Sequence, residues 1–250
     1  MKQPRPDERS NAPSVSRETT PEKIAGKTRE LVSRWLHETT LRPRAGFLDR
    51  IQAMAAALAL WGAHTNLTAD ASDPAEIAFH IVDSLAPIAF AAGAGGESLD
   101  SALGADGNVL DLGSGGGFPG LVLAAAFEAR FRLTEARRKR ASYLQVAAQE
   151  MELSNVIVER RRASPRTIAG GFDLVTARAF GASAELFEIA AAALAPGGLL
   201  LLYASADQVG DSPTAANRFF DERITWTYLL PHGERIAKRS AVLRRRKADP

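Results

Sequence analysis

The chain has 250 residues and a mass of 26.7 kDa, and it is 46% hydrophobic and 24% charged. Such a composition is typical of globular proteins and excludes a chain that is disordered or fibrous throughout. Cysteine is absent and the four histidines are scattered, which excludes disulfides, thiol nucleophiles and cysteine-ligated metals and argues against any metal site. The net charge of +2 is uneven, because residues 46–130 carry −8 and residues 131–250 carry +6.

Residues 1–22 are rich in proline, serine, threonine and charge, so we expect a disordered tail without the apolar stretch of a secretory signal. The longest uncharged window, 189–206, contains Pro196-Gly197-Gly198, which predicts a turn before a strand and not a membrane helix. We therefore expect a cytoplasmic protein with no membrane contact.

Residues 23–107 predict a helical cap and its connection. Apolar side chains recur at steps of three and four from Ile24 to Leu36 and from Phe47 to Trp61. Asp73 and Pro74 are typical of the start of a third helix, which runs to Ile88. The segment 91–107 is rich in glycine, alanine and serine and is predicted to be a loose connection.

Residues 108–250 predict an α/β domain, because strand and helix patterns alternate there. Helical runs are expected at 119–129, 138–153 and 182–195. The pattern favours a parallel sheet closed by an antiparallel hairpin at 224–243. The other expected strands are 109–112, 131–134, 156–159, 172–177 and 199–203.

A glycine-rich turn follows the first of these strands, in the segment Val109-Leu-Asp-Leu-Gly-Ser-Gly-Gly-Gly-Phe-Pro-Gly120. Gly113, Gly115 and Gly117 permit positive φ and leave room for a ligand to reach backbone N–H groups at a helix N-terminus. Asp111 lies inside the strand, where it would repel a diphosphate but attract the ammonium of an amino-acid-bearing ligand. Glu135 ends the next strand, a position suited to ribose hydroxyls.

The combination of Asp111, the glycine loop and Glu135 favours S-adenosylmethionine as the cofactor. Two alternatives stay open. One is a structural turn in which Asp111 caps the next helix and Glu135 is solvated. The other is a nicotinamide cofactor bound through Gly-x-Gly-x-x-Gly at 115–120, in which case Asp111 would have no role.

Basic residues cluster in the second half of the chain, at 137–140, 160–166 and 235–247. Such clusters are typical of surfaces that bind phosphate backbones, although solvated helix faces and a basic tail give the same pattern.

Five further segments match one family in order and spacing: Trp61…Asn66-Leu67-Thr68, His80-Ile-Val-Asp83-Ser84-Leu85, Glu135…Lys139-Arg140…Tyr143-Leu144, Arg162-Ala163 and Phe172-Asp-Leu-Val-Thr-Ala-Arg178-Ala179-Phe180. With the glycine loop, they resemble the small-subunit ribosomal RNA guanine-N7 methyltransferases, the RsmG/GidB family, from about residue 47 to 246. The Asn-Leu-Thr and His-x-x-Asp-Ser-Leu segments carry the resemblance furthest, because general methyltransferase folds do not share them.

The resemblance implies a Rossmann-like class I methyltransferase fold with a seven-stranded sheet, and S-adenosylmethionine as the cofactor. It also implies that the protein is a monomer whose partner is small-subunit 16S ribosomal RNA or the small ribosomal subunit. The implied cofactor residues, together with Asp111, are Gly113, Gly115, Gly117, Phe118, Glu135, Ala163, Ser164 and Arg178. Arg178 is the catalytic candidate at the cofactor and substrate mouth. The candidate RNA contacts are Arg138, Lys139, Arg140 and Phe180. His80 and Asp83 either contact substrate or fix the cap to the sheet from the interior.

The chain departs from the family at three places. Ser164 replaces a glutamate, Tyr203-Ala204 replace Lys-Gly, and Ala136 replaces a serine. The basic clusters at 137–140 and 160–162 are candidates to replace the missing lysine.

The chemistry favours N7 independently of the resemblance. Pyrimidine C5 methylation needs a cysteine, and exocyclic amino methylation usually needs a Pro-Pro motif that 176–180 lacks. Guanine N7 needs neither a base nor a covalent intermediate, only positioning. A methyltransferase with another acceptor and a non-catalytic binding module are the alternatives.

Overall fold

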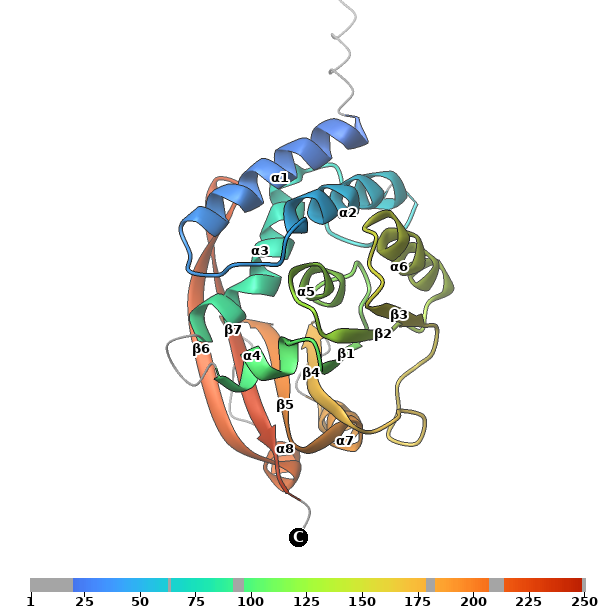
Figure 1. Cartoon of the computed structure of the whole chain (residues 1–250), viewed down its shortest axis with the longest axis vertical. Coiled ribbons are helices and arrows are strands. Elements are labelled where there is room, and N and C mark those ends of the chain that lie inside the picture. The colour runs from blue at the N-terminus through green and yellow to red at the C-terminus, as the bar shows by residue number, and fades with distance from the viewer. Residues whose placement is uncertain (1–19, 63, 92–96, 179–182, 207–213, 249–250) are drawn as a thin grey trace, which may run out of the picture.

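The computed structural model describes residues 20–62, 64–91, 97–178, 183–206 and 214–248 and is built on one seven-stranded sheet (Figure 1). The strand order is β3-β2-β1-β4-β5-β7-β6. Neighbouring strands from β3 to β5 run parallel, whereas β7 is antiparallel to both β5 and β6. This confirms the predicted parallel sheet with a closing hairpin. The strands are β1 (Asn108–Leu112), β2 (Arg130–Thr134), β3 (Val156–Glu159), β4 (Phe172–Arg178), β5 (Leu194–Ser205), β6 (Phe220–His232) and β7 (Arg235–Arg246).

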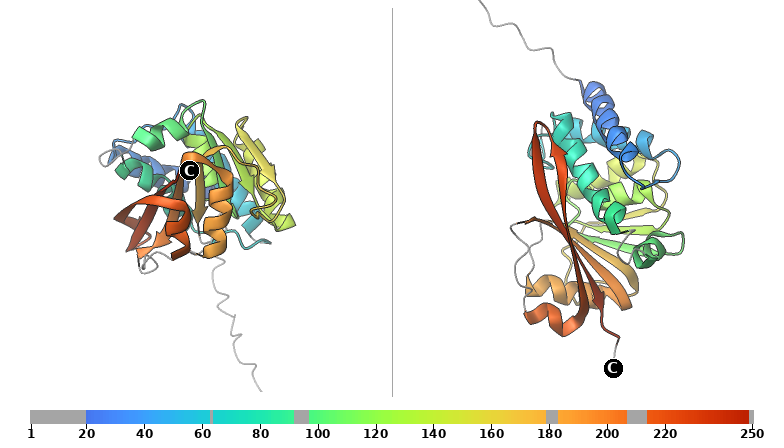
Figure 2. Two further views of the ribbon diagram at one scale, coloured as in Figure 1. Left: turned by 90° about the horizontal axis from the view of Figure 1, so that it is seen from below. Right: turned by 90° about the vertical axis from the view of Figure 1, so that its left-hand side faces the viewer.

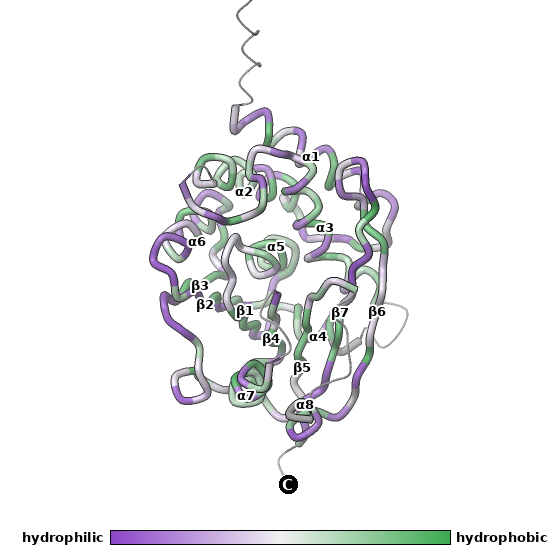
Figure 3. Tube along the Cα trace, turned by 180° about the vertical axis from the view of Figure 1, so that it is seen from behind, coloured by the Kyte–Doolittle hydropathy of each residue, from purple (hydrophilic) through white to green (hydrophobic). Residues whose placement is uncertain are grey.

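Helices cover both faces of the sheet, and a separate hydrophobic core lies on each side (Figure 2). On one side are α5 (Gly120–Ala126) and α6 (Arg138–Glu150), and on the other are α7 (Ala184–Ala193) and α8 (Thr214–Phe219). Successive strand residues alternate between the two cores, so that Val109 belongs to the first and Leu110 to the second. In Figure 3 the turns of α1 and α6 are largely hydrophilic, while α5 and β5 are largely hydrophobic.

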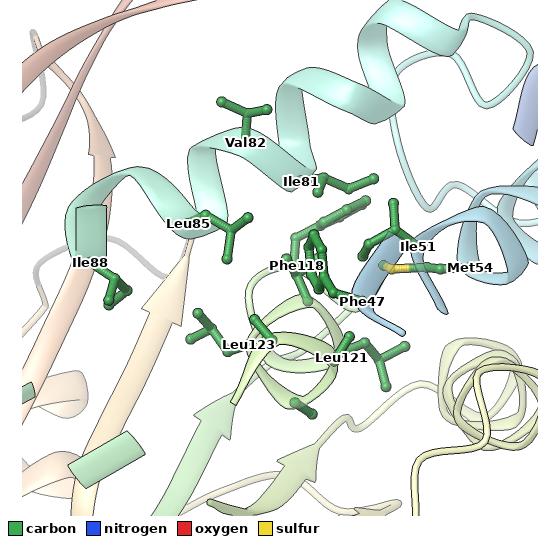
Figure 4. Packing of buried hydrophobic residues seen from close by; sticks show 14 of the residues in the cluster. Phe47, Ile51, Met54, Ile81, Val82, Leu85, Ile88, Phe118, Leu121 and Leu123 are labelled. Carbon is green, nitrogen blue, oxygen red and sulfur yellow. The ribbon is translucent and has the colours of Figure 1, made fainter. Parts of the chain in front are cut away.

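The predicted cap helices are α1 (Pro21–His37), α2 (Phe47–Gly62) and α3 (Pro74–Ala91). They share the first core with α5 and the sheet, and Figure 4 shows Phe118 packed among side chains such as Ile81 and Phe47. α3 is apolar and long enough to cross a bilayer by composition, but 72% of that window is buried inside the protein. It is therefore placed as a core helix.

Several predicted boundaries were wrong. The segment 91–107 contains a helix, α4 (Glu97–Leu103), whose Leu99, Ala102 and Leu103 are buried. The surrounding small residues concealed this short amphipathic pattern. Pro196-Gly197-Gly198 lie within β5 and not before it. They interrupt its pairing with β4, since Phe172 pairs with Leu194 and the regular pairing resumes only at Leu174 and Leu199.

Other elements extend into segments that were predicted to be irregular. α1 begins at Pro21, inside the expected tail, and the Thr20 hydroxyl accepts a hydrogen bond from the Lys23 amide as its N-cap. α8 occupies part of the expected polar stretch, and β6 starts four residues earlier than predicted. The rest of the tail lies outside the described residues.

Candidate functional site

The candidate site lies at the carboxyl edge of the parallel strands. β1 has β2 on one side and β4 on the other, so chain connections leave β1 and β4 in opposite directions. Open α/β sheets bind ligands in the crevice at such a switch point. Asp111 lies near the end of β1, the glycines follow β1, Glu135 follows β2, and Arg178 ends β4. Residues from three separate parts of the chain therefore meet at this edge.

The glycine loop takes the conformation that its sequence predicts. Gly113, Gly115 and Gly117 have φ values of 70°, 52° and 87°, which disfavour residues with a side chain. Gly116 is required for a different reason, since a Cβ there would lie 2.7 Å from the Leu67 carbonyl oxygen of the cap. The connection between α2 and α3, which contains Leu67, therefore packs directly against the glycine loop.

Asp111 is buried in β1. Its Oδ1 accepts a hydrogen bond from the Thr176 hydroxyl on β4 at 2.8 Å. Its Oδ2 is buried against the backbone of Gly120, the first residue of α5, and a hydrogen bond from the Gly120 amide is among the influences that lower the pKa of this carboxyl. Burial raises the pKa of Asp111 to about 6. A buried carboxylate favours a nearby cationic group, and its contact with Gly120 also fits the alternative in which Asp111 caps α5.

Glu135 contacts the loop directly. Its Oε2 accepts from the Gly115 amide at 3.2 Å and its Oε1 accepts from the Arg137 amide at 2.7 Å. A carboxylate has about four lone-pair sites, so both oxygens keep capacity for hydroxyl donors. The carboxylate is only 6% exposed, which argues against the alternative in which it is solvated.

Ala163 and Ser164 follow β3 at the same edge. Ala163 is buried. The Ser164 amide donates to the Thr167 hydroxyl at 3.2 Å, and the two hydroxyls lie 2.8 Å apart. Thr167 therefore shapes the turn in which the family's glutamate is replaced, a contact that the sequence analysis did not anticipate.

Arg178 is held in a buried charge cluster below the cap. Its Nη2 lies 3.2 Å from Asp83 Oδ2 and 2.6 Å from His80 Nδ1, both on α3. Its guanidinium carbon is 5.8 Å from the centre of the Phe118 ring in the glycine loop. Arg178 thus joins α3 of the cap to the glycine loop at the carboxyl edge of the sheet.

Asp83 has further partners that sequence reasoning missed. It is fully buried and accepts from Arg239 Nε and Nη2 at 3.1 and 3.0 Å and from the Tyr228 hydroxyl at 3.0 Å. This supports the interior reading of Asp83, in which it fixes the cap to the sheet. The sequence offered one signal for Arg239. Side chains alternate along a strand, so Arg239 has to face the opposite side of β7 from Lys238 in the same basic cluster.

Tyr203 also binds the cap. Its hydroxyl donates to the Ser84 carbonyl of α3 at 2.8 Å, and the residue is buried at 4% exposure. The position where the family usually has lysine therefore holds an anchor between β5 and α3.

The candidate RNA residues divide into groups. Arg138 and Lys139 are exposed at the start of α6. Arg140 Nη2 instead donates to the Asn66 carbonyl of the cap at 2.6 Å, and Phe180 lies outside the described residues. In the second cluster, Arg161 pairs with Glu159 at 2.5 Å, and the same carboxylate pairs with Arg132 at 3.1 Å.

The chain is similar to several known proteins. A ribosomal RNA small subunit methyltransferase G from Wolinella succinogenes is 33% identical over 66% of this chain and 78% of its own length. One from Acidiphilium cryptum is 40% identical over 60% of this chain and 65% of its own. A solved tRNA (m1A58) methyltransferase from Aquifex aeolicus gives a TM-score of 0.47 at 16% identity, covering 61% of this chain and 67% of that one. The GidB model, described as rRNA small subunit methyltransferase G, matches residues 48–220, and the chain therefore belongs to this family.

Proposed function

We propose that this protein transfers a methyl group from S-adenosylmethionine to N7 of a guanine in 16S ribosomal RNA. The observation that carries the proposal is the coincidence of the family's glycine loop with two buried acids, Asp111 and Glu135. The negative charge of Asp111 favours a ligand that carries a cation, which a dinucleotide does not offer at this position. We further propose that the protein acts in the cytoplasm as a monomer.

The residues present fit the cofactor. Asp111 would receive its ammonium, and Glu135 its ribose hydroxyls. The loop would line the methionine and ribose, and the turn after β3 the adenine. The proposed loop and turn residues are Gly113, Gly115, Gly117, Phe118, Ala163 and Ser164.

S-adenosylmethionine supplies an electrophilic methyl group. Guanine N7 carries a lone pair and no proton, so the protein has to align the two reacting atoms at about 3–3.5 Å without a general base. We place Arg178, by its resemblance to the family's arginine position, at the mouth of the site, where a guanidinium N–H that its partners on α3 leave available would donate to the O6 acceptor of guanine and orient the base. Its support from Asp83 keeps it in one position.

The RNA is proposed to approach the exposed start of α6. Arg138 and Lys139 are the first two residues of α6, which begins three residues after Glu135 at the carboxyl edge of the sheet. Phosphate contacts there would anchor the RNA while the target base enters the site.

The first experiment tests the reaction. The purified protein is incubated with radiolabelled S-adenosylmethionine and small subunits from cells that lack the endogenous enzyme, and the nucleosides are analysed. We expect label in 7-methylguanosine, lost in Gly113→Asp. Gly26→Asp is the matched control, because a Cβ at Gly26 meets nothing within 4 Å. Absence of label with folded, cofactor-binding protein would refute the proposed function.

A second experiment tests the RNA surface. Replacing Arg138 and Lys139 by alanine should weaken RNA binding and reduce the slope of log K against log salt by about 1–2. Lys23 and Lys27 on α1 provide a control pair with the same loss of charge. Equal effects of the two pairs would contradict a local RNA contact on α6.

A further inference from the structure

The ring of His80 lies between a carboxylate and the guanidinium of Arg178. His80 Nε2 is 3.0 Å from Glu76 Oε1, and Nδ1 is 2.6 Å from Arg178 Nη2. Arg178 Nη1 also donates to the His80 carbonyl at 3.3 Å. One residue of α3 therefore holds Arg178 through two separate acceptors.

These two partners specify the protonation of the ring. A guanidinium has only donors, so Nδ1 has to be the acceptor, and a carboxylate has only acceptors, so Nε2 has to carry the hydrogen. Only the neutral Nε2–H tautomer satisfies both contacts. Burial independently lowers the pKa of His80.

Glu76 continues the chain of contacts to the hairpin. Its Oε2 lies 2.5 Å from His232 Nε2 at the end of β6. The His232 ring is stacked on Phe79 at 4.2 Å between centroids. The hydrogen bond from His80, with that from His232, lowers the pKa of Glu76 to about 2, so this carboxylate stays ionised.

We propose that His80 is a positioning residue, which in its neutral Nε2–H form, oriented by Glu76 and His232, holds Arg178 at the mouth of the methyl-transfer site. This inference rests on the proposed function for its kinetic consequences and on geometry alone for the tautomer. The charged groups that act on the ring are Glu76, Arg178 and Asp83. Behind them, His232 contacts Glu76, and Tyr228 and Arg239 contact Asp83. The carboxylates of Glu76 and Asp83 balance the charges of Arg178 and Arg239. Protonation of His80 would place an N–H and a positive charge opposite Arg178 and would break the hydrogen bond that Nδ1 accepts.

Two expectations follow for catalysis, measured as kcat with both substrates saturating so that changes in cofactor affinity do not enter. His80→Ala should lower kcat about 10- to 100-fold, as expected when a reacting geometry is loosened, with the Kd for S-adenosylmethionine changed less than about threefold. His80→Gln keeps one acceptor and one donor and should restore much of kcat at pH 7.5. It should also lack the acidic fall in kcat that protonation of His80 causes in the parent protein.

His37→Gln, on the exposed end of α1, is the matched histidine control and should leave kcat and its pH profile unchanged. A His80→Gln profile that falls at acidic pH as the parent profile does would overturn the proposal. So would a loss in His80→Ala confined to KM or to protein stability.

The tautomer is tested without activity. With only four histidines, ¹⁵N-histidine labelling resolves each ring, and His80→Gln assigns the signals. At pH 7 we expect His80 with a protonated Nε2 and an unprotonated Nδ1. The Arg178→Gln variant should raise the pKa of His80 by removing the adjacent cation. An Nδ1–H or charged ring at pH 7 would refute the inference even if the protein methylates RNA. The expected tautomer in a protein that makes no 7-methylguanosine would refute only the proposed function.

Discussion

Asp111→Asn is expected to remove a pH dependence of cofactor binding that the parent protein shows. The pKa of Asp111 is about 6 because the carboxyl is buried. About nine tenths of the groups are then ionised at pH 7 and about one tenth at pH 5. If the cofactor ammonium binds the ionised form, the apparent Kd for S-adenosylmethionine rises about tenfold between these pH values. An ordinary aspartate, with a pKa near 3.8, would give almost no change.

Binding is measured by titration calorimetry at pH 5, 6 and 7. At pH 7, Asp111→Asn should weaken binding about 10- to 100-fold, the range of a hydrogen bond to a charged group, and the remaining affinity should not vary with pH. The fold should tolerate the change, since the asparagine oxygen can still accept from Thr176. The substitution also removes a buried charge.

Methylthioadenosine is the matched ligand, because it has the adenosine and the sulfur but no ammonium. Its affinity for the parent protein should be the same at pH 5 and pH 7. Equal pH dependence for the two ligands, or a parent Kd for S-adenosylmethionine that does not change with pH, would refute the role assigned to Asp111.

Gly116→Ala should lower the free energy of unfolding by about 1–3 kcal/mol in urea titrations, because the new Cβ would overlap the Leu67 carbonyl; Gly26→Ala, in open space, should instead stabilise α1 by up to about 1 kcal/mol. Asn155→Ala should cost about 2–3 kcal/mol in the same assay, since the Asn155 amide donates to the carbonyls at the end of α5. The pKa of Glu76 is lowered from 4.5 to about 2, so its stabilisation is present above pH 4.5 and is lost as the pH falls towards 2. The free energy of unfolding, measured by urea titration, should therefore fall less between pH 6 and pH 3 for Glu76→Gln than for the parent. An equal fall would contradict the contacts of Glu76 with His80 and His232.

Much of the fold was predictable because it follows local rules. The strand before the glycine loop is a short apolar run, and the loop itself needs positive φ at defined positions, which glycine supplies. Its acid, Asp111, is two residues from the first glycine, so the chemistry of the cofactor edge is readable over a dozen residues. α4 escaped prediction because its three buried side chains are too few to show a helical period among glycines and alanines.

The partners of Arg178 were less accessible to sequence reasoning. Its position at the end of a strand was predictable, but Asp83 and Arg239, which share its charge cluster, are 156 residues apart in the chain. Arg140 shows the same limit. It belongs to a basic run that suggests RNA binding, yet its guanidinium reaches a carbonyl of the cap.

By itself, the sequence determined the strand pattern and the place of the glycine loop, because each depends on neighbouring residues and on backbone preferences. Only the tertiary structure decided which charges are structural. Lys238 and Arg239 are adjacent and both positively charged, and alternation along a strand requires that they face opposite sides. The packing of α3 on the hairpin selects Arg239 for the buried Asp83 and leaves Lys238 exposed. The physical reason is that a buried carboxylate has to be neutralised where it lies, and that place exists only once the cap has docked on the sheet.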